Sequence, residues 1–215
     1  MQYRYVFFDL DGTLLDTLAD LQDSVNTVIA RYGLPPITRS EAAHFLGNGA
    51  KHLVHCSLKD RVSPEQEEVI LDEYKAWHQD HCQIKTEPYP GIMELLANLK
   101  AAGCRMAVVS NKPDPAVREL NATFFGDLLE TAIGEKKEIR RKPAPDTLLE
   151  AMRLLGADRE ECVYIGDTEV DLQTAANAGL RCICVAWGFR SVEELRAAGA
   201  GTIVTNAYEL ERCIL

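Results

Sequence analysis

From residue 88 onward, short apolar runs alternate with helical segments, and this alternation limits the possible folds more than any other feature of the chain. Helical patterns such as those at 147–155 and 172–178 separate most of the apolar runs. Alternating strands and helices predict a mostly parallel sheet with right-handed crossovers. We therefore expect an α/β fold. The expected strands are residues 5–8, 105–109, 131–133, 162–165, 182–186 and 202–204.

The stretch between the first two expected strands follows a different, helical pattern. Apolar residues recur at helical spacing between positions 18 and 32. Thr38 with Glu41 predicts a capping box at the start of a further helix. These residues form a small helical bundle in our interpretation, inserted after the first strand. The expected domains are an α/β core of residues 1–15 and 88–215 and a helical insert of residues 16–87.

Polar clusters follow three of the expected strands, and another precedes an expected helix. In a parallel sheet the carboxyl ends of neighbouring strands meet at one edge, where active sites of open α/β sheets lie. Carboxylates at that edge, with a lysine and a hydroxyl, suit a divalent cation and a phosphoryl group together. The clusters are Asp9-Leu10-Asp11-Gly12-Thr13, Ser110-Asn111-Lys112, Lys142-Pro143 and Gly166-Asp167-Thr168-Glu169-Val170-Asp171.

Each cluster taken alone has a simpler interpretation as a turn, a helix cap or a solvated basic run. Their joint occurrence at strand ends, in one order, favours chemistry instead. Asp9 and Asp11 stand two residues apart where a buried strand ends. One carboxylate can then attack a phosphorus centre while the other moves protons.

Charge and cysteine usage narrow the expected partners and location. The chain has 33 acidic and 23 basic residues, which disfavours nucleic acid or an anionic membrane as the main partner. No apolar stretch approaches the roughly 20 residues needed to span a bilayer, and the first residues lack the layout of a signal peptide. The seven cysteines form no CxxC pair. We expect a reduced, cytoplasmic setting. The strand-end clusters, rather than the composition, favour a small phosphorylated metabolite as the partner.

The ordered motifs resemble those of the haloacid dehalogenase superfamily of phosphatases. The resemblance runs through nearly the whole chain and implies a Rossmann-like parallel core with a small helical cap inserted after the first strand. Within the superfamily, residues 46–49, 86–91 and 110–112 look most like phosphoglycolate phosphatases. Residues 135–141 depart from that pattern, because the mixed sequence Glu135-Lys136-Lys137-Glu138-Ile139-Arg140-Arg141 stands in place of the acidic pair usual after the preceding glycine.

The resemblance implies a Mg²⁺-dependent phosphatase that acts through an aspartyl-phosphate. Asp9 would be the nucleophile. Asp11 would protonate the leaving oxygen and then deprotonate the water that hydrolyses the intermediate. Asp9, the main-chain carbonyl of Asp11, and Asp167 would hold Mg²⁺, with Asp171 as an indirect or water-mediated contact. Because the dehalogenases of the superfamily lack an acid at the position of Asp11, carbon–halogen cleavage is disfavoured.

The same resemblance implies the residues that bind substrate. Ser110 and Lys142 would bind the transferring phosphoryl group, together with Gly12, Thr13 and the backbone of Asn111. Lys112 would be either a second phosphate contact or a surface charge.

A loop of the insert is the candidate for substrate selection. Gly47, Asn48 and Gly49 allow a close approach of the backbone to an anion at a helix start. Lys51 could add a charge for a substrate carboxylate. The alternative is an ordinary helix-start loop with a surface lysine.

Several functions share this chemistry. Phosphoglycolate is the first expected substrate, while a phosphomutase of the β-phosphoglucomutase type, a pyrophosphatase and a 5′-nucleotidase stay open. A silent binding module is disfavoured, because all the expected catalytic residues are present. Neither an HExxH pattern nor a cysteine partner supports a zinc site at the two histidine pairs, His52 with His55 and His78 with His81. We expect them to pack or to lie at the surface rather than to bind zinc.

Overall fold

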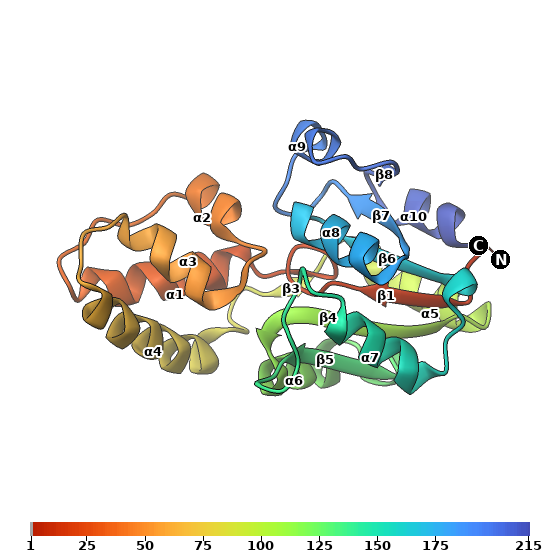
Figure 1. The fold of residues 1–215 in the computed structure, drawn as a ribbon, viewed down its shortest axis with the longest axis horizontal. Coiled ribbons are helices and arrows are strands. Elements are labelled where there is room, and N and C mark those ends of the chain that lie inside the picture. Colours follow the sequence, from red (N-terminus) through yellow and green to blue (C-terminus); the bar gives the residue numbers. More distant parts are fainter. Residues whose placement is uncertain (1) are drawn as a thin grey trace. The chain divides into compact units, whose positions relative to one another are not determined.

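The structure is a computed structural model that describes residues 2–215, and within it the chain forms two compact units (Figure 1). One unit is α/β and contains the residues up to Leu15 together with Pro88–Leu215. The other is helical and contains Asp16–Glu87. The short strands β2 (Leu15–Asp16) and β3 (Glu87–Pro88) pair with one another where the chain passes from one unit to the other.

The α/β unit is built on a six-stranded sheet with the order β5-β4-β1-β6-β7-β8. All neighbouring strands run parallel, which confirms the predicted fold class. The first strand lies between β4 and β6, so Phe8 pairs with both Val108 and Ile165. The carboxyl ends of these three strands therefore meet at one edge. The strands are β1 (Tyr5–Phe8), β4 (Arg105–Pro113), β5 (Thr131–Glu135), β6 (Cys162–Gly166), β7 (Arg181–Val185) and β8 (Ile203–Val204).

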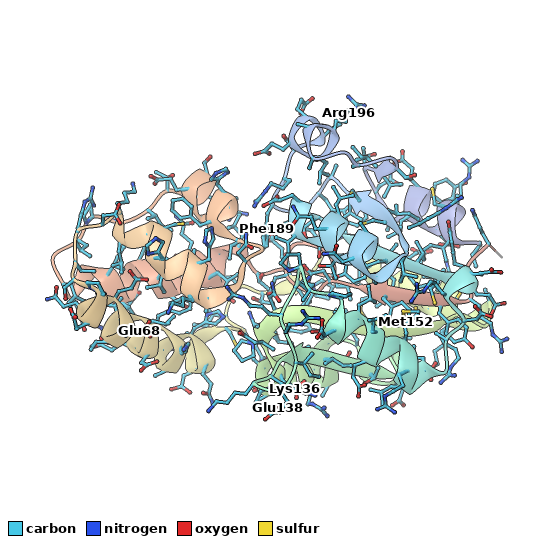
Figure 2. All side chains as sticks on the ribbon, viewed as in Figure 1. Glu68, Lys136, Glu138, Met152, Phe189 and Arg196 are labelled. Carbon is cyan, nitrogen blue, oxygen red and sulfur yellow. The ribbon has the colours of Figure 1, made fainter. Side chains whose placement is uncertain are left out.

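Helices cover both faces of this sheet. Side chains alternate along a strand, so Val6 and Phe8 join one apolar cluster while Tyr5 and Phe7 join another. The first cluster includes residues of α5, α6 and α10, and the second includes residues of α7 and α8, among them Met152 (Figure 2). Burial on both faces explains why the first strand is a continuous apolar run. The helices are α5 (Ile92–Ala101), α6 (Asp114–Phe124), α7 (Asp146–Leu155), α8 (Glu169–Ala178), α9 (Val192–Ala197) and α10 (Ala207–Ile214), with short 3₁₀ turns at Gly126–Leu128 and Arg159–Glu161.

The strand bounds differ from the prediction by one residue at one or both ends of β6, β7 and β8, and by more at β4 and β5. Strand β4 continues to Pro113 and β5 to Glu135, beyond the apolar runs that end at Val109 and Ile133. The pairing register shifts between Val109 and Pro113. This irregular segment carries Ser110, Asn111 and Lys112, which are buried polar residues rather than a turn outside the strand. Hydrophobicity alone could not detect a strand end made of functional residues.

The helical unit contains α1 (Leu18–Ala30), α2 (Arg39–Phe45), α3 (Gly49–Leu58) and α4 (Pro64–His81). The predicted capping box of Thr38 and Glu41 is confirmed at the start of α2. A buried carboxylate also fastens the end of the unit, because Asp20 on α1 accepts hydrogen bonds from the main-chain N–H groups of Ile84, Lys85 and Thr86. Across residues 2–215, no helix has the length and apolar character needed to cross a membrane.

Candidate active site

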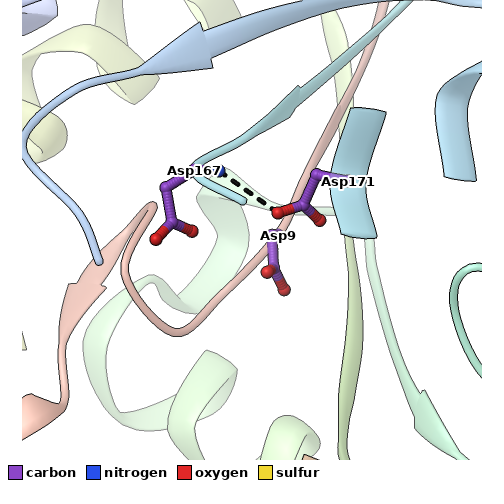
Figure 3. A group of neighbouring side chains, drawn as sticks. All are labelled: Asp9, Asp167 and Asp171. Atoms are coloured by element: carbon purple, nitrogen blue, oxygen red, sulfur yellow. Dashed lines mark hydrogen bonds between the residues drawn. The ribbon is translucent and has the colours of Figure 1, made fainter. Parts of the chain in front are cut away.

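Three buried carboxylates lie together at the carboxyl edge of the sheet (Figure 3). Asp9 follows β1, Asp167 follows β6, and Asp171 stands in the first turn of α8. One oxygen atom from each side chain lies within 4.8 Å of those of the other two. The parallel pairing of the first and sixth strands brings together residues that are far apart in the sequence.

Hydrogen bonds from the protein surround the carboxylate of Asp171. Its Oδ1 accepts from Lys142 Nζ at 2.8 Å and from the Tyr164 hydroxyl at 3.1 Å. Its Oδ2 accepts from the main-chain N–H groups of Asp167 and Thr168 and from the Thr168 hydroxyl. Burial raises the pKa of Asp171, but Lys142 and Thr168 outweigh burial and lower it below the ordinary value. Asp171 is thus suited to orienting Lys142 rather than to direct contact with a metal.

The carboxylates of Asp9 and Asp167 accept fewer bonds from the protein. Asp9 Oδ1 accepts from the N–H of Leu10 at 2.7 Å. Asp167 accepts from the Thr13 hydroxyl at 2.9 Å and from the N–H of Phe189 at 2.8 Å. Burial, together with the neighbouring aspartates, raises the pKa of Asp9 well above its ordinary value. Burial and the charge of Asp171 raise the pKa of Asp167 to about 7.

The charges of this cluster fit a divalent cation. Three carboxylates carry −3 when ionised, and the ammonium of Lys142 among them contributes +1, which leaves −2. Buried charge of one sign is costly unless it is compensated. Because carboxylate oxygens are the ligands that Mg²⁺ prefers, the donor set suits this ion. Asp9 and Asp167 are the side chains that we expect to hold it.

Lys142 is held rigidly between two carboxylates. Its Nζ lies 2.9 Å from Asp9 Oδ1 and 2.8 Å from Asp171 Oδ1. Burial lowers the pKa of Lys142, but the two carboxylates outweigh burial and raise it above the ordinary value, so the ammonium stays charged. Both main-chain groups of Lys142 bond to the side chain of Asn111, at 2.8 Å for N–H and 3.1 Å for the carbonyl. The side chain of Asn111 therefore positions Lys142.

A second buried lysine stands beside Asp11. Lys112 Nζ lies 3.2 Å from Asp11 Oδ1, and the Lys112 side chain is only 5% exposed. The interpretation of Lys112 as a surface charge is therefore wrong. Ser110 is also buried, and its Oγ accepts a hydrogen bond from the Lys112 N–H at 3.2 Å. The structure thus gathers all the predicted site residues of the α/β unit at one edge, while their roles stay predictions.

Glycine is required at the turn directly after the two aspartates of the first motif. Gly12 has a φ of +83°, which L side chains rarely adopt. A Cβ added at Gly12 would also lie 2.3 Å from Asp167 Oδ2. The Thr13 hydroxyl bonds to Asp167. Gly12 therefore lies close to the carboxylate of Asp167, and Thr13 bonds to it. The contact of both residues with the phosphoryl group stays a prediction.

The predicted selection loop belongs to the helical unit, where Gly47 and Asn48 directly precede α3 and Gly49 begins it. Within that unit, Lys51 Nζ forms an exposed ion pair at 2.6 Å with Glu68 on α4, the residue labelled in Figure 2. This surface ion pair fits an ordinary helix-start loop with a surface lysine as well as it fits a substrate-binding loop. The role of Lys51 in binding a substrate carboxylate stays a prediction.

The histidines of the two pairs contact separate side chains within the helical unit. His55 bonds to Glu67, and His78 bonds to Ser24. His81 stacks on Trp77 with ring centroids 3.9 Å apart. One point of the sequence analysis was wrong, because His52 does have a nearby cysteine: Cys56 Sγ lies 3.5 Å from His52 Nε2, one helical turn away. Within residues 2–215, only Asp9, Asp167 and Asp171 form a group of three or more candidate metal ligands.

Sequence reasoning missed the loop after β7. Trp187 Nε1 donates to the carbonyl of Thr13 at 3.0 Å. The N–H of Phe189 donates to Asp167 (Figure 2), and Arg190 forms two hydrogen bonds to the carboxylate of Glu169. The loop therefore fastens the first motif to the fourth. Its position directly after an apolar run was the available signal, because strand ends of a parallel sheet line the site.

We predict that Gly188→Ala destabilises the protein. A Cβ at Gly188 would lie 2.3 Å from the Gly12 carbonyl oxygen and 2.4 Å from Asp167 Oδ2, so the loop would have to move. Overpacking of this kind lowers the free energy of unfolding by about 1–3 kcal/mol, which chemical denaturation measures. Gly201→Ala is the matched control, because nothing lies within 4 Å of a Cβ there. Equal unfolding midpoints for the two variants would contradict the close approach.

Comparisons with known proteins agree with this arrangement. The sequence model of the haloacid dehalogenase-like hydrolase family matches residues 6–185. A crystal structure from Lactobacillus delbrueckii subsp. bulgaricus, provisionally described as a phosphoglycolate phosphatase, is 40% identical. It covers 100% of this chain and 99% of that chain with a TM-score of 0.95.

Two curated relatives come from Pseudomonas aeruginosa. Phosphoglycolate phosphatase 1 is 32% identical, and the match covers 98% of this chain and 79% of the relative. N-acetylmuramic acid 6-phosphate phosphatase is also 32% identical, with 98% of this chain and 94% of the relative covered. These two relatives carry names that specify different phosphorylated substrates.

Proposed function

The chain belongs to the haloacid dehalogenase-like hydrolase family and is a phosphatase, and from this premise we propose that it hydrolyses a small phosphomonoester through a phosphorylated Asp9. The observation that carries the proposal is the position of Asp9. Its buried carboxylate stands within 2.9 Å of the Lys142 ammonium and belongs to the cluster that suits a divalent cation. A carboxylate with a cation beside it is suited to attack at an electron-rich phosphoryl group.

The reaction proceeds in two displacements. In the first, a carboxylate oxygen of Asp9 bonds to phosphorus while the bond from phosphorus to the ester oxygen breaks, and Asp11 gives its proton to the leaving oxygen. In the second, Asp11 takes a proton from water as the water oxygen attacks phosphorus. The acyl-phosphate bond then breaks, which releases inorganic phosphate and restores Asp9. Lys142 and Ser110 bind the phosphoryl oxygens in both steps.

The carboxylates of the site provide the ligands for the metal ion. Asp9, Asp167 and the main-chain carbonyl of Asp11 would hold Mg²⁺, and Asp171 would act on it indirectly. When bound, Mg²⁺ neutralises charge on the phosphoryl group and on the carboxylates around it. Thr13 and Phe189 fix the orientation of Asp167 through their hydrogen bonds.

Phosphoglycolate is the substrate that we propose first, supported by the names of the relatives. N-acetylmuramic acid 6-phosphate is the second candidate, because the relative named for it matches this chain over 94% of its own length. A phosphomutase differs only in the acceptor of the phosphoryl group. We place the activity in the cytoplasm, consistent with seven free cysteines in the described chain.

We predict that phosphate release depends on Mg²⁺ and favours a small anionic ester. The measurement is steady-state phosphate release with Mg²⁺ or with a chelator. The panel contains phosphoglycolate, N-acetylmuramic acid 6-phosphate, sugar phosphates, nucleotides, pyrophosphate and an aryl phosphate. Chelation should reduce turnover at least about 100-fold, because the uncompensated carboxylates would repel the phosphoryl group, and added Mg²⁺ should restore it.

The panel also separates the alternatives. Turnover concentrated on pyrophosphate or nucleotides would replace the phosphoglycolate assignment while keeping the role of Asp9. Conversion of a sugar phosphate to its isomer without phosphate release would identify a mutase. Undiminished turnover in the presence of chelator would contradict the metal site.

A further inference from the structure

The α/β unit buries two lysines in its site, and they stand beside different carboxylates. Lys142 Nζ lies 2.9 Å from Asp9 Oδ1, which belongs to the proposed nucleophile. Lys112 Nζ lies 3.2 Å from Asp11 Oδ1, which belongs to the proposed acid. Lys112 therefore stands next to the group that serves the leaving oxygen rather than next to the group that attacks phosphorus.

We propose that Lys112 is a specificity-determining residue that binds a carboxylate on the leaving alcohol. The substrate class that it favours is the phosphate esters of 2-hydroxy acids. The inference rests on the proposed function, because it takes Asp11 as the acid, and it goes further by assigning the recognition of one substrate group to one residue. It also replaces the interpretation of Lys112 as a second phosphate contact.

The reach of the two side chains supports this class. An acid must lie about 2.6–3.2 Å from the oxygen that it protonates. Lys112 Nζ contacts this acid directly, at 3.2 Å from Asp11 Oδ1. In a 2-hydroxy acid, two bonds of about 1.5 Å each separate the ester oxygen from the carboxylate carbon. The carboxylate can then reach Lys112 while the ester oxygen faces Asp11.

Electrostatics makes the lysine necessary for such a substrate. A carboxylate beside the ester oxygen would stand close to the carboxylate of Asp11, and like charges at this distance repel. An ammonium has three donors, so Lys112 can bind Asp11 and a substrate carboxylate together. The buried position of Lys112 strengthens its attraction, because water screens it less than at the surface.

The backbone at Lys112 is fixed before substrate arrives. Its N–H donates to Ser110 Oγ at 3.2 Å. Its carbonyl oxygen is in close contact with Gly134, where a Cβ would approach it to 2.5 Å. Gly134 is itself held by a hydrogen bond from its N–H to Asp114 Oδ1 at 3.0 Å. A lysine placed by such contacts needs little reorganisation to bind an anion.

The test measures binding rather than turnover. Asp9→Asn removes the nucleophile, so that esters bind without reacting, and calorimetry in Mg²⁺ then gives the Kd of each ester. The two probes are phosphoglycolate and 2-hydroxyethyl phosphate, which has an uncharged hydroxymethyl group in place of the carboxylate. We expect phosphoglycolate to bind at least tenfold more tightly. Adding Lys112→Met should reduce that ratio at least tenfold, whereas adding Lys137→Met, at an exposed position, should not change it.

Each other outcome overturns the proposal. Equal weakening of both esters by Lys112→Met would show a phosphate contact, and an unchanged ratio would show that Lys112 does not recognise the carboxylate. A ratio near one before any change at Lys112, or no binding of either ester, would remove the basis for the inference. Failure of the proposed function is seen separately, as the absence of phosphate release by the unaltered protein over the whole panel.

Discussion

Asp9→Asn should lower the turnover number for every substrate of the panel by at least about 10⁴-fold, because the amide cannot form the phosphorylated intermediate that we propose. The substitution keeps the size of the side chain, so the surrounding contacts stay nearly the same. Single-turnover experiments that detect an acyl-phosphate on the protein should find phosphorylated protein with Asp9 and none with asparagine. The measurement thus tests the intermediate as well as the rate.

The fold should survive this change. Burial and the neighbouring aspartates raise the pKa of Asp9, which means that its charge destabilises the folded state at neutral pH. Removing the charge therefore leaves the thermal midpoint equal or higher, although one contact of Lys142 becomes weaker. Asp127→Asn, at an exposed position of the same unit, is the matched control and should keep full activity. If Asp9→Asn retained phosphate release with an unchanged midpoint, another residue would have to be the nucleophile.

The parts of the site that sequence could indicate are those encoded by neighbouring residues. Asp9 and Asp11 were visible because they follow an apolar strand within one short segment. The capping box of Thr38 and Glu41 was visible for the same reason, since a box needs only residues three apart. The parallel sheet followed from the alternation of apolar runs and helical patterns, which is a property of the chain and needs no contact information.

The parts that sequence could not indicate depend on contacts between distant segments. Nothing near Lys112 in the sequence shows that it is buried beside Asp11, 101 positions away. Tyr164 reads as an ordinary strand residue, yet its hydroxyl bonds to both Lys142 and Asp171. The sequence also gives no sign that the side chain of Asn111 bonds to both main-chain groups of Lys142.

Lys142→Met should damage both activity and stability, because this lysine lies between two of the three buried carboxylates. Loss of the cation that we propose binds the phosphoryl group should lower turnover by about 10³-fold. Without Mg²⁺, the variant also leaves three buried carboxylates with no lysine among them, a net −3 in place of −2 when all three are ionised. Breaking a buried ion pair from one side lowers the free energy of unfolding by about 3–5 kcal/mol, which denaturant titration in chelator measures.

Measuring stability with and without Mg²⁺ distinguishes uncompensated charge from a simple packing defect. If the loss of stability comes from uncompensated charge, Mg²⁺ should raise the unfolding midpoint of Lys142→Met more than that of the unaltered protein, since the cation meets a greater excess of negative charge. Lys137→Met, whose side chain belongs to the same basic run but is exposed, should match the unaltered protein in both conditions. A loss of stability in Lys142→Met that Mg²⁺ does not reduce would instead indicate that methionine disturbs the packing around Tyr164. The charge balance of the three aspartates would then no longer support the assignment of the metal site.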